Sequence, residues 1–192
     1  MNLLSHAFLK WQAMLWYALG MTDRACRTYD RLLEQWPNDA KALAARTHLH
    51  AQDKRLSLAL ADSERLVALK PEDARAWFNH GYLLELAEQW DAALAAFERS
   101  VTLSPKLDRA WYGMGLVLIR LQRYDDAVEA LQRNTELQPM SPYGWYQLAR
   151  VHVDRQQPEE ALKVIKHLKG FEPKVAAQLE RETGLIVGQA SA

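Results

Sequence analysis

Three cations stand 34 residues apart in this chain of 192 residues: Lys41, Arg75 and Arg109. Other side chains suited to binding follow at helical spacings of three, four and seven residues, namely Phe78, Tyr82, Tyr112, Tyr146 and Arg150. Guanidinium groups form forked hydrogen bonds with carboxylates, and tyrosine offers a large, rigid contact area. The pattern therefore predicts binding of an acidic peptide rather than bond-breaking chemistry.

Two other interpretations compete with this one. Arg75 and Arg109 could instead pair with nearby carboxylates such as Glu72 and Asp108. Some of the aromatic side chains could pack between adjacent helices and only stabilise the array, and those are Phe78, Tyr112 and Tyr146.

The elements that would position these side chains follow from a longer pattern with the same period. Five of the seven prolines are 34 residues apart (Pro37, Pro71, Pro105, Pro139 and Pro173), and so are five alanines (Ala25, Ala59, Ala93, Ala127 and Ala161). Large apolar residues lie four positions from the columns of small residues, which is a helix period. Each repeat is therefore predicted to form two antiparallel helices, the second of which ends before the proline. The repeats cover residues 6–39, 40–73, 74–107, 108–141 and 142–175.

The third repeat carries the fullest set of marker residues: Trp77, Gly81, Leu84, Ala93, Phe97 and Pro105. This pattern resembles the tetratricopeptide repeat, and the resemblance extends over residues 6–175. It implies an all-α fold, a right-handed superhelical alpha-solenoid whose first helices line a concave groove for a peptide, helix or partner domain. Residues 1–192 are then expected to form a single domain, with a capping helix over residues 176–189.

The amino-terminal segment, residues 3–19, is apolar on nearly every face. Its large side chains without a preceding repeat to cover them are Phe8, Trp11, Leu15 and Trp16. We expect a second copy of the chain, as a homodimer, or a partner to cover them; folding onto the second repeat is the alternative. The segment lacks the basic start of a secretory signal, and Lys10 interrupts it. We therefore expect a cytoplasmic protein without stable membrane insertion.

Composition and motifs disfavour several other functions. The 24 Lys and Arg residues balance the 24 Asp and Glu residues, so binding of nucleic acid, including RNA, is not expected. Cys26 is the only cysteine, which excludes an internal disulfide. Gly113 and Gly115 lack the third glycine of a phosphate-binding loop, and packing inside a helix explains them better. No catalytic or zinc-binding motif is present, so we expect no enzyme activity, cofactor or metal.

The sequence thus predicts a non-catalytic scaffold or adaptor that binds a peptide or partner segment of acidic character. The alternative is a chaperone or regulatory subunit that is obligately bound to an enzyme or to a secretion or assembly component. In that case the apolar segment at residues 3–19 would form the contact with the partner.

Overall fold

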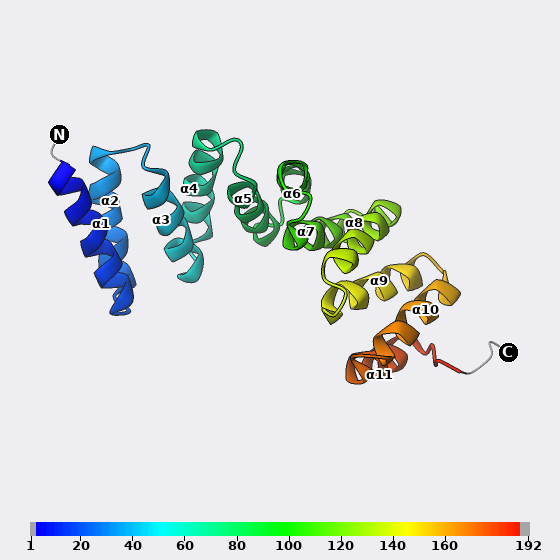
Figure 1. Ribbon diagram of the computed structural model, residues 1–192. Coiled ribbons are helices and arrows are strands. Elements are labelled where there is room, and N and C mark those ends of the chain that lie inside the picture. Colours follow the sequence, from blue (N-terminus) through cyan, green and yellow to red (C-terminus); the bar gives the residue numbers. More distant parts are fainter. Residues whose placement is uncertain (1–2, 189–192) are drawn as a thin grey trace. The chain divides into compact units, whose positions relative to one another are not determined.

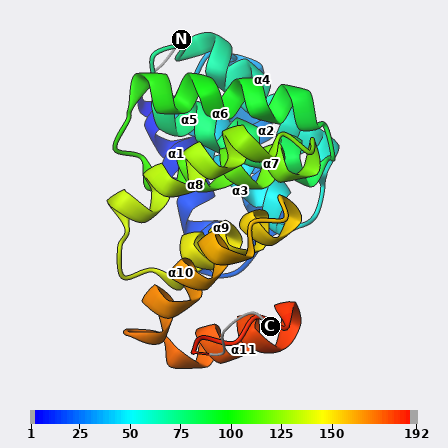
Figure 2. The ribbon, with the colours of Figure 1, turned by 90° about the vertical axis from the view of Figure 1, so that its right-hand side faces the viewer.

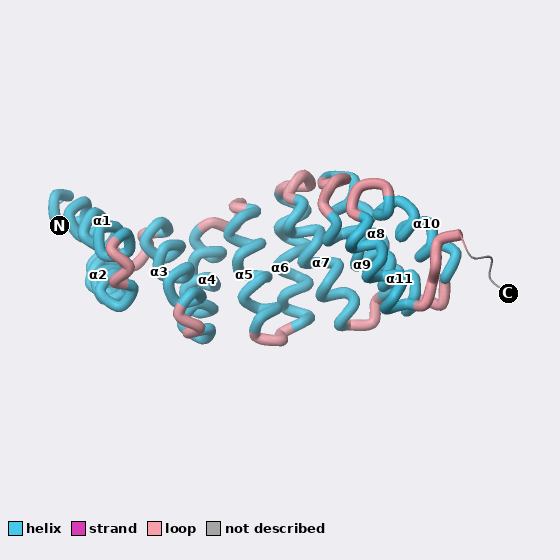
Figure 3. The backbone as a smooth tube through the Cα atoms, turned by 90° about the horizontal axis from the view of Figure 1, so that it is seen from below, coloured by secondary structure: helices cyan, strands magenta, loops and turns pink. Residues whose placement is uncertain are grey.

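The protein consists of α-helices joined by short loops over residues 3–188, the range described by the computed structural model (Figure 1; Figure 3). That range contains eleven helices and no strand, which confirms the all-α prediction. The helices are α1 (Leu3–Ala18), α2 (Thr22–Gln35), α3 (Ala40–Gln52), α4 (Leu56–Leu69), α5 (Ala74–Leu86), α6 (Trp90–Leu103), α7 (Asp108–Arg120), α8 (Tyr124–Leu137), α9 (Pro142–Asp154), α10 (Pro158–Lys169) and α11 (Pro173–Thr183).

The helices group into two compact units, one up to Gln89 with α1 to α5 and the other from Trp90 with α6 to α11. In the first unit α1 packs against α2 and α3 against α4, while α2 and α4 also contact the helix that follows each. In the second unit α7 packs against α8 and α9 against α10, and α6, α8 and α10 contact their successors (Figure 2). Each unit is thus a stack of helix hairpins. The single domain remains a prediction.

Proline and tryptophan recur together because they fix the connection between consecutive hairpins. The indole Nε1 of Trp77 donates a hydrogen bond to the carbonyl oxygen of Pro71 at 2.9 Å. The same bond joins Trp111 to Pro105 and Trp145 to Pro139. Helix α4 ends at Leu69, two residues before Pro71, because proline cannot donate to a continuing helix and restricts the residue before it.

The turn inside each hairpin contains one residue in the left-handed conformation, which the sequence analysis missed. These residues have φ angles between 57° and 70° and are again 34 positions apart: Gly20, Lys54, Glu88, Gln122 and Gln156. The next residue donates its N–H five positions back, as Arg123 does to the carbonyl of Leu118 at 2.9 Å, which is a Schellman ending. Because the residue type varies from glycine to lysine, glutamate and glutamine, no repeated letter marks this position.

Small residues allow the helices to approach closely, as the repeat columns predict. The five alanines of the column that begins at Ala25 are fully buried. A Cβ atom added to Gly113 of α7 would lie 2.6 Å from the ring of Phe97 in α6, and one added to Gly115 would lie 2.8 Å from Leu131 in α8. Both glycines therefore serve packing, which confirms their interpretation from the sequence.

The final helix differs from the expected capping helix at residues 176–189. Helix α11 covers Pro173–Thr183, so it begins earlier and ends earlier, and residue 189 lies outside the described residues. Pro173 starts the helix because its missing N–H is not needed in the first turn. Gly184, with φ at 73°, ends it in the left-handed conformation that glycine adopts without strain. Leu179 of α11 is fully buried, in line with a capping role.

Candidate peptide-binding site

Lys41, Arg75 and Arg109, which we call the cationic row, occupy the same place in three helices, the second residue of α3, α5 and α7. All three are exposed, and none forms an ion pair within residues 3–188. The alternative of pairing with Glu72 or Asp108 is therefore not observed. The row belongs to both units, since Lys41 and Arg75 lie in the first and Arg109 in the second.

Helix stability does not explain a cation at this place. The first turn of a helix carries the positive end of the helix dipole, which disfavours a nearby cation by about 0.3–1 kcal/mol. Exposed backbone N–H groups at the same end attract anions. A cation and a helix N-terminus together therefore form a place where a carboxylate is favoured.

The predicted aromatic residues differ in their exposure. Tyr82 of α5 is 49% exposed, so its ring is open to a ligand. Phe78 and Tyr112 are half-buried, and both interact with other residues of the protein. For these two side chains, packing and binding both remain open as roles.

Tyr146 and Arg150 of α9 hold a carboxylate from the last helix. The Tyr146 hydroxyl donates to Oε2 of Glu182 at 2.5 Å, and Nη1 of Arg150 lies 3.3 Å from the same oxygen. The hydrogen bond from Tyr146, together with one from Gln178, lowers the pKa of Glu182, and the same Tyr146–Glu182 bond raises the pKa of Tyr146. Sequence reasoning found Tyr146 and Arg150 but not their partner, because α11 does not continue the full repeat pattern.

The second unit brings several predicted residues onto neighbouring helices. Arg109 and Tyr112 lie on α7, which contacts α9 with Tyr146 and Arg150, and α9 contacts α11. In the first unit, Lys41 lies on α3 and Arg75 and Tyr82 on α5. The assignment of all these residues to one binding site stays a prediction.

Helix α1 presents an apolar face that is not covered within the described part of the chain. Phe8, Trp11 and Leu15 are exposed, with Trp11 at 60%. Two further exposed residues on this helix, Leu4 and Met14, were not predicted.

Trp16 differs from the other three residues predicted at this edge. It is only half-buried by the helices beneath it, packs on the core of the first unit, and stacks under the guanidinium of Arg24, 5.0 Å from the ring centre. Its place in the exposed edge was therefore wrong, because it points toward α2 instead. The polar side of α1 is tied to the start of α3, since both His6 and Lys10 contact the carboxylate of Asp39. Asp39 also caps α3 by accepting from the Ala42 N–H.

An unpredicted group of buried ion pairs lies between α2, α3 and α4, and we call it the Arg46 cluster. Arg46 of α3 donates through Nε and Nη2 to both oxygens of Asp62, at 2.7 Å each, and through Nη1 to Asp30 at 2.6 Å. Asp62 is only 4% exposed. Burial acts to lower the pKa of Arg46, but its hydrogen bonds with the two aspartates raise that pKa above the usual value.

Two kinds of site find no geometric support in residues 3–188. No helix there is long and apolar enough to cross a membrane. No group of three or more His, Cys, Asp or Glu side chains in that range is placed to hold a metal ion. His80, for example, pairs its Nδ1 with the hydroxyl of Ser63 at 2.8 Å, and burial lowers its pKa.

The stacked hairpins define a helical-repeat protein. Sequence models of the tetratricopeptide repeat match residues 11–39, 47–110 and 84–146. The chain belongs to the tetratricopeptide-repeat family. The number of five repeats stays a prediction, because these matches do not fix it.

Solved structures share the fold over most of their length. A crystal structure of MamA protein is 20% identical, covers 98% of both chains and has a TM-score of 0.82. MamA 41-end from Desulfovibrio magneticus RS-1 is 21% identical, with 93% of this chain and 96% of that chain covered and a TM-score of 0.79. YrrB, described as a TPR protein with an unusual peptide-binding site, is 21% identical, with 88% of each chain covered and a TM-score of 0.79. At this identity the likeness concerns the fold alone. No curated protein sequence matches the chain.

Proposed function

We propose that the protein is a non-catalytic scaffold that binds an acidic peptide or an acidic segment of a partner protein along its first helices. The observation that carries the proposal is the cationic row, three exposed cations without ion pairs at helix N-termini. Stability disfavours cations at these positions, whereas capture of a carboxylate would account for them.

The contact with Glu182 supports an acidic ligand. Tyr146 and Arg150, two residues predicted to bind a peptide, already hold a carboxylate of this chain. A peptide carboxylate offers the same oxygen atoms and could replace that of Glu182. The likeness in fold to YrrB, whose description names a peptide-binding site, is consistent with a peptide as the ligand.

The proposal is tested with a fluorescein-labelled deca-glutamate peptide and its deca-glutamine counterpart in fluorescence anisotropy titrations. We expect saturable binding of deca-glutamate only. The binding should weaken steeply as salt rises from about 0.01 to about 1 M, because the Debye length then falls from about 30 to about 3 Å. Equal binding of the two peptides, or no binding of either at low salt, would refute an acidic ligand.

We further propose that the apolar face of α1 pairs with the same face of a second copy. The face formed by Leu4, Phe8, Trp11 and Leu15 carries no charge, and an uncharged stripe is complementary to itself across a twofold axis. Covering it removes exposed apolar area from water. A regulatory or chaperone subunit remains the second candidate function, with a different protein covering this face.

Light scattering over a range of concentrations tests the homodimer. We expect a concentration-dependent dimer for the unchanged chain and a monomer for Trp11→Glu, because a buried unpaired carboxylate would disfavour the interface. Met140→Glu changes an equally exposed apolar residue of the second unit and should leave the dimer intact. A monomer at every concentration would rule out self-association, and insolubility in the absence of a co-expressed partner would favour the subunit role. The cytoplasmic location stays a prediction.

A further inference from the structure

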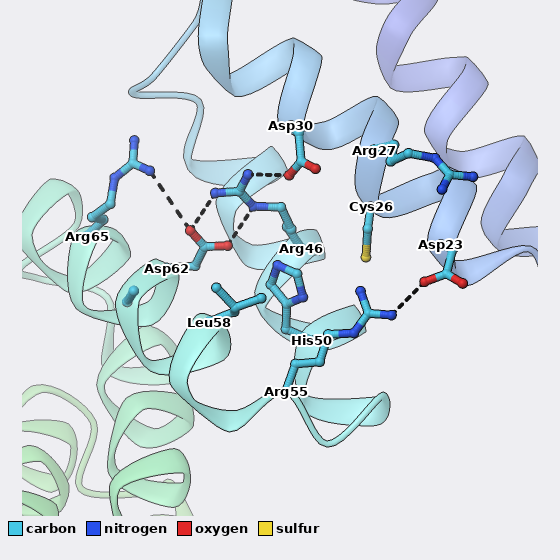
Figure 4. Close-up of a pocket in the computed structure, with 11 residues that line it drawn as sticks. Asp23, Cys26, Arg27, Asp30, Arg46, His50, Arg55, Leu58, Asp62 and Arg65 are labelled. Carbon is cyan, nitrogen blue, oxygen red and sulfur yellow. Dashed lines mark hydrogen bonds and ion pairs between the residues drawn. The ribbon is translucent and has the colours of Figure 1, made fainter.

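A cavity of ≈480 Å³ lies in the first unit beside the Arg46 cluster (Figure 4). Side chains from α2, α3 and α4 line it, together with Arg55 from the turn before α4. Arg46 and His50 reach it from α3. Residues two positions apart on a helix point about 200° apart, so these two lie on the other side of α3 from Ala44 and His48 of the predicted peptide face. The cavity is therefore separate from the proposed peptide site.

The polar lining breaks the repeat at three core positions. The second repeat carries Arg46, His50 and Asp62 where the fourth repeat carries Met114, Leu118 and Ala130. Leu118 and Ala130 are almost fully buried, which is the ordinary use of these positions. Polar groups placed there lose hydration, so packing alone does not explain why three of them come together.

The charges around the cavity leave an excess of donors. Four arginines and three aspartates line it, and every aspartate already has an arginine partner. Arg46 holds Asp30 and Asp62, and Nη2 of Arg55 donates to Asp23 at 2.5 Å. The unused donors therefore decide the sign of a ligand.

Two side chains of the lining stand without partners. Arg27 forms no ion pair or hydrogen bond within residues 3–188. His50 is 6% exposed, and its Nδ1 has no hydrogen-bond partner among the described residues. A buried nitrogen in this state costs free energy until a ligand or water pairs with it.

We propose that this cavity binds an oxyanion, the phosphate or carboxylate group of a small molecule, through Arg27, Arg55 and His50. Guanidinium forks match both kinds of oxyanion. The cavity volume lies within the range of about 300–1,000 Å³ that small-molecule sites occupy. Asp23 already uses one donor of Arg55, so the ligand competes with this carboxylate.

Isothermal titration calorimetry with inorganic phosphate and with malonate, at constant ionic strength, tests the site on the full chain. We expect one equivalent of at least one anion to bind, and the melting temperature to rise with its concentration up to about 50 mM, where even a ligand with a millimolar Kd stabilises detectably. Binding of phosphate alone identifies a phosphate site, and binding of malonate alone identifies a carboxylate site. Absence of saturable binding for both anions overturns the proposal.

Variants locate the binding. Arg27→Gln and Arg55→Gln should weaken it at least tenfold, whereas Arg31→Gln, an exposed change on the same helix outside the cavity, should have no effect. Asp23→Asn should strengthen it severalfold, because it frees Arg55 and removes a competing negative charge. The Arg75→Glu/Arg109→Glu variant should bind the anion as the unchanged chain does. Loss of anion binding in that variant, or unchanged binding in Arg27→Gln, would place the anion elsewhere and overturn the proposal.

Discussion

Replacing Arg46 with methionine is expected to lower the free energy of unfolding by about 3–5 kcal/mol, because the carboxylate of Asp62 then stays buried without its partner. Asp62 loses two hydrogen bonds of 2.7 Å, and its next cation, Arg65, is 3.9 Å away. Urea unfolding of the full chain, followed by circular dichroism and by tryptophan fluorescence, measures the change. Transitions that differ between the two signals would show that the two units unfold separately.

The double variant Arg46→Met/Asp62→Ala distinguishes a stabilising ion pair from a costly one. It gives the second repeat the residues that the fourth repeat has at the same positions, Met114 and Ala130. We expect it to recover most of the lost stability, because apolar replacements of a buried ion pair are often neutral or stabilising. A double variant as unstable as Arg46→Met would show that the cluster itself holds α2, α3 and α4 together.

An exposed ion pair provides the control for this experiment. Arg133 and Glu136 pair three residues apart on α8, and both side chains are substantially exposed. Arg133→Met should therefore cost less than about 1 kcal/mol. A similar loss for Arg133→Met and Arg46→Met would contradict the importance of burial.

The cluster therefore bears on function as well as on stability. If apolar residues serve equally well at these core positions, stability does not account for Arg46 and Asp62. Their remaining effect is to fix arginine side chains around the cavity, because Arg46 neutralises Asp30 and Asp62 and leaves Arg27 and Arg55 as the donors for a ligand. Preorganised donors of this kind lower the entropic cost of binding.

The parts of the fold that could be predicted are those in which one residue type recurs. Prolines end the second helices, and small residues such as Gly113 mark close contacts between helices, so both could be recognised from the sequence. The left-handed turn residues could not, because Lys54 and Gln122 adopt the same φ as Gly20 without sharing its chemistry. Backbone hydrogen bonds fix that conformation rather than the side chain.

The candidate sites were predictable to different degrees for the same reason. The cationic row repeats every 34 residues and was visible at once. The Arg46 cluster joins three helices and appears in the sequence only as departures from otherwise apolar core columns. The contact from Tyr146 to Glu182 spans 36 residues and uses a helix outside the repeats, so only the structure reveals it.

Reversing two charges of the cationic row, in Arg75→Glu/Arg109→Glu, is expected to weaken deca-glutamate binding at least tenfold. The two substitutions remove attraction and add repulsion, and a loss of about 1.4 kcal/mol already corresponds to a factor of ten. The same change should leave the free energy of unfolding unchanged or raise it by about 0.3–1 kcal/mol per site, because a carboxylate suits the positive end of the helix dipole. Anisotropy titrations and urea unfolding measure the two effects on the same samples.

The opposite signs of these effects make the interpretation specific. General damage to the fold would lower binding and stability together, whereas a binding role separates them. Arg31→Glu, at an exposed residue of α2 without an ion pair in the described range, controls for net charge and should keep at least half of the affinity. Unchanged binding in the double variant, or an equal loss in Arg31→Glu, would mean that the row contributes only to the overall charge. The carboxylate-binding role would then fall to Tyr146 and Arg150 alone.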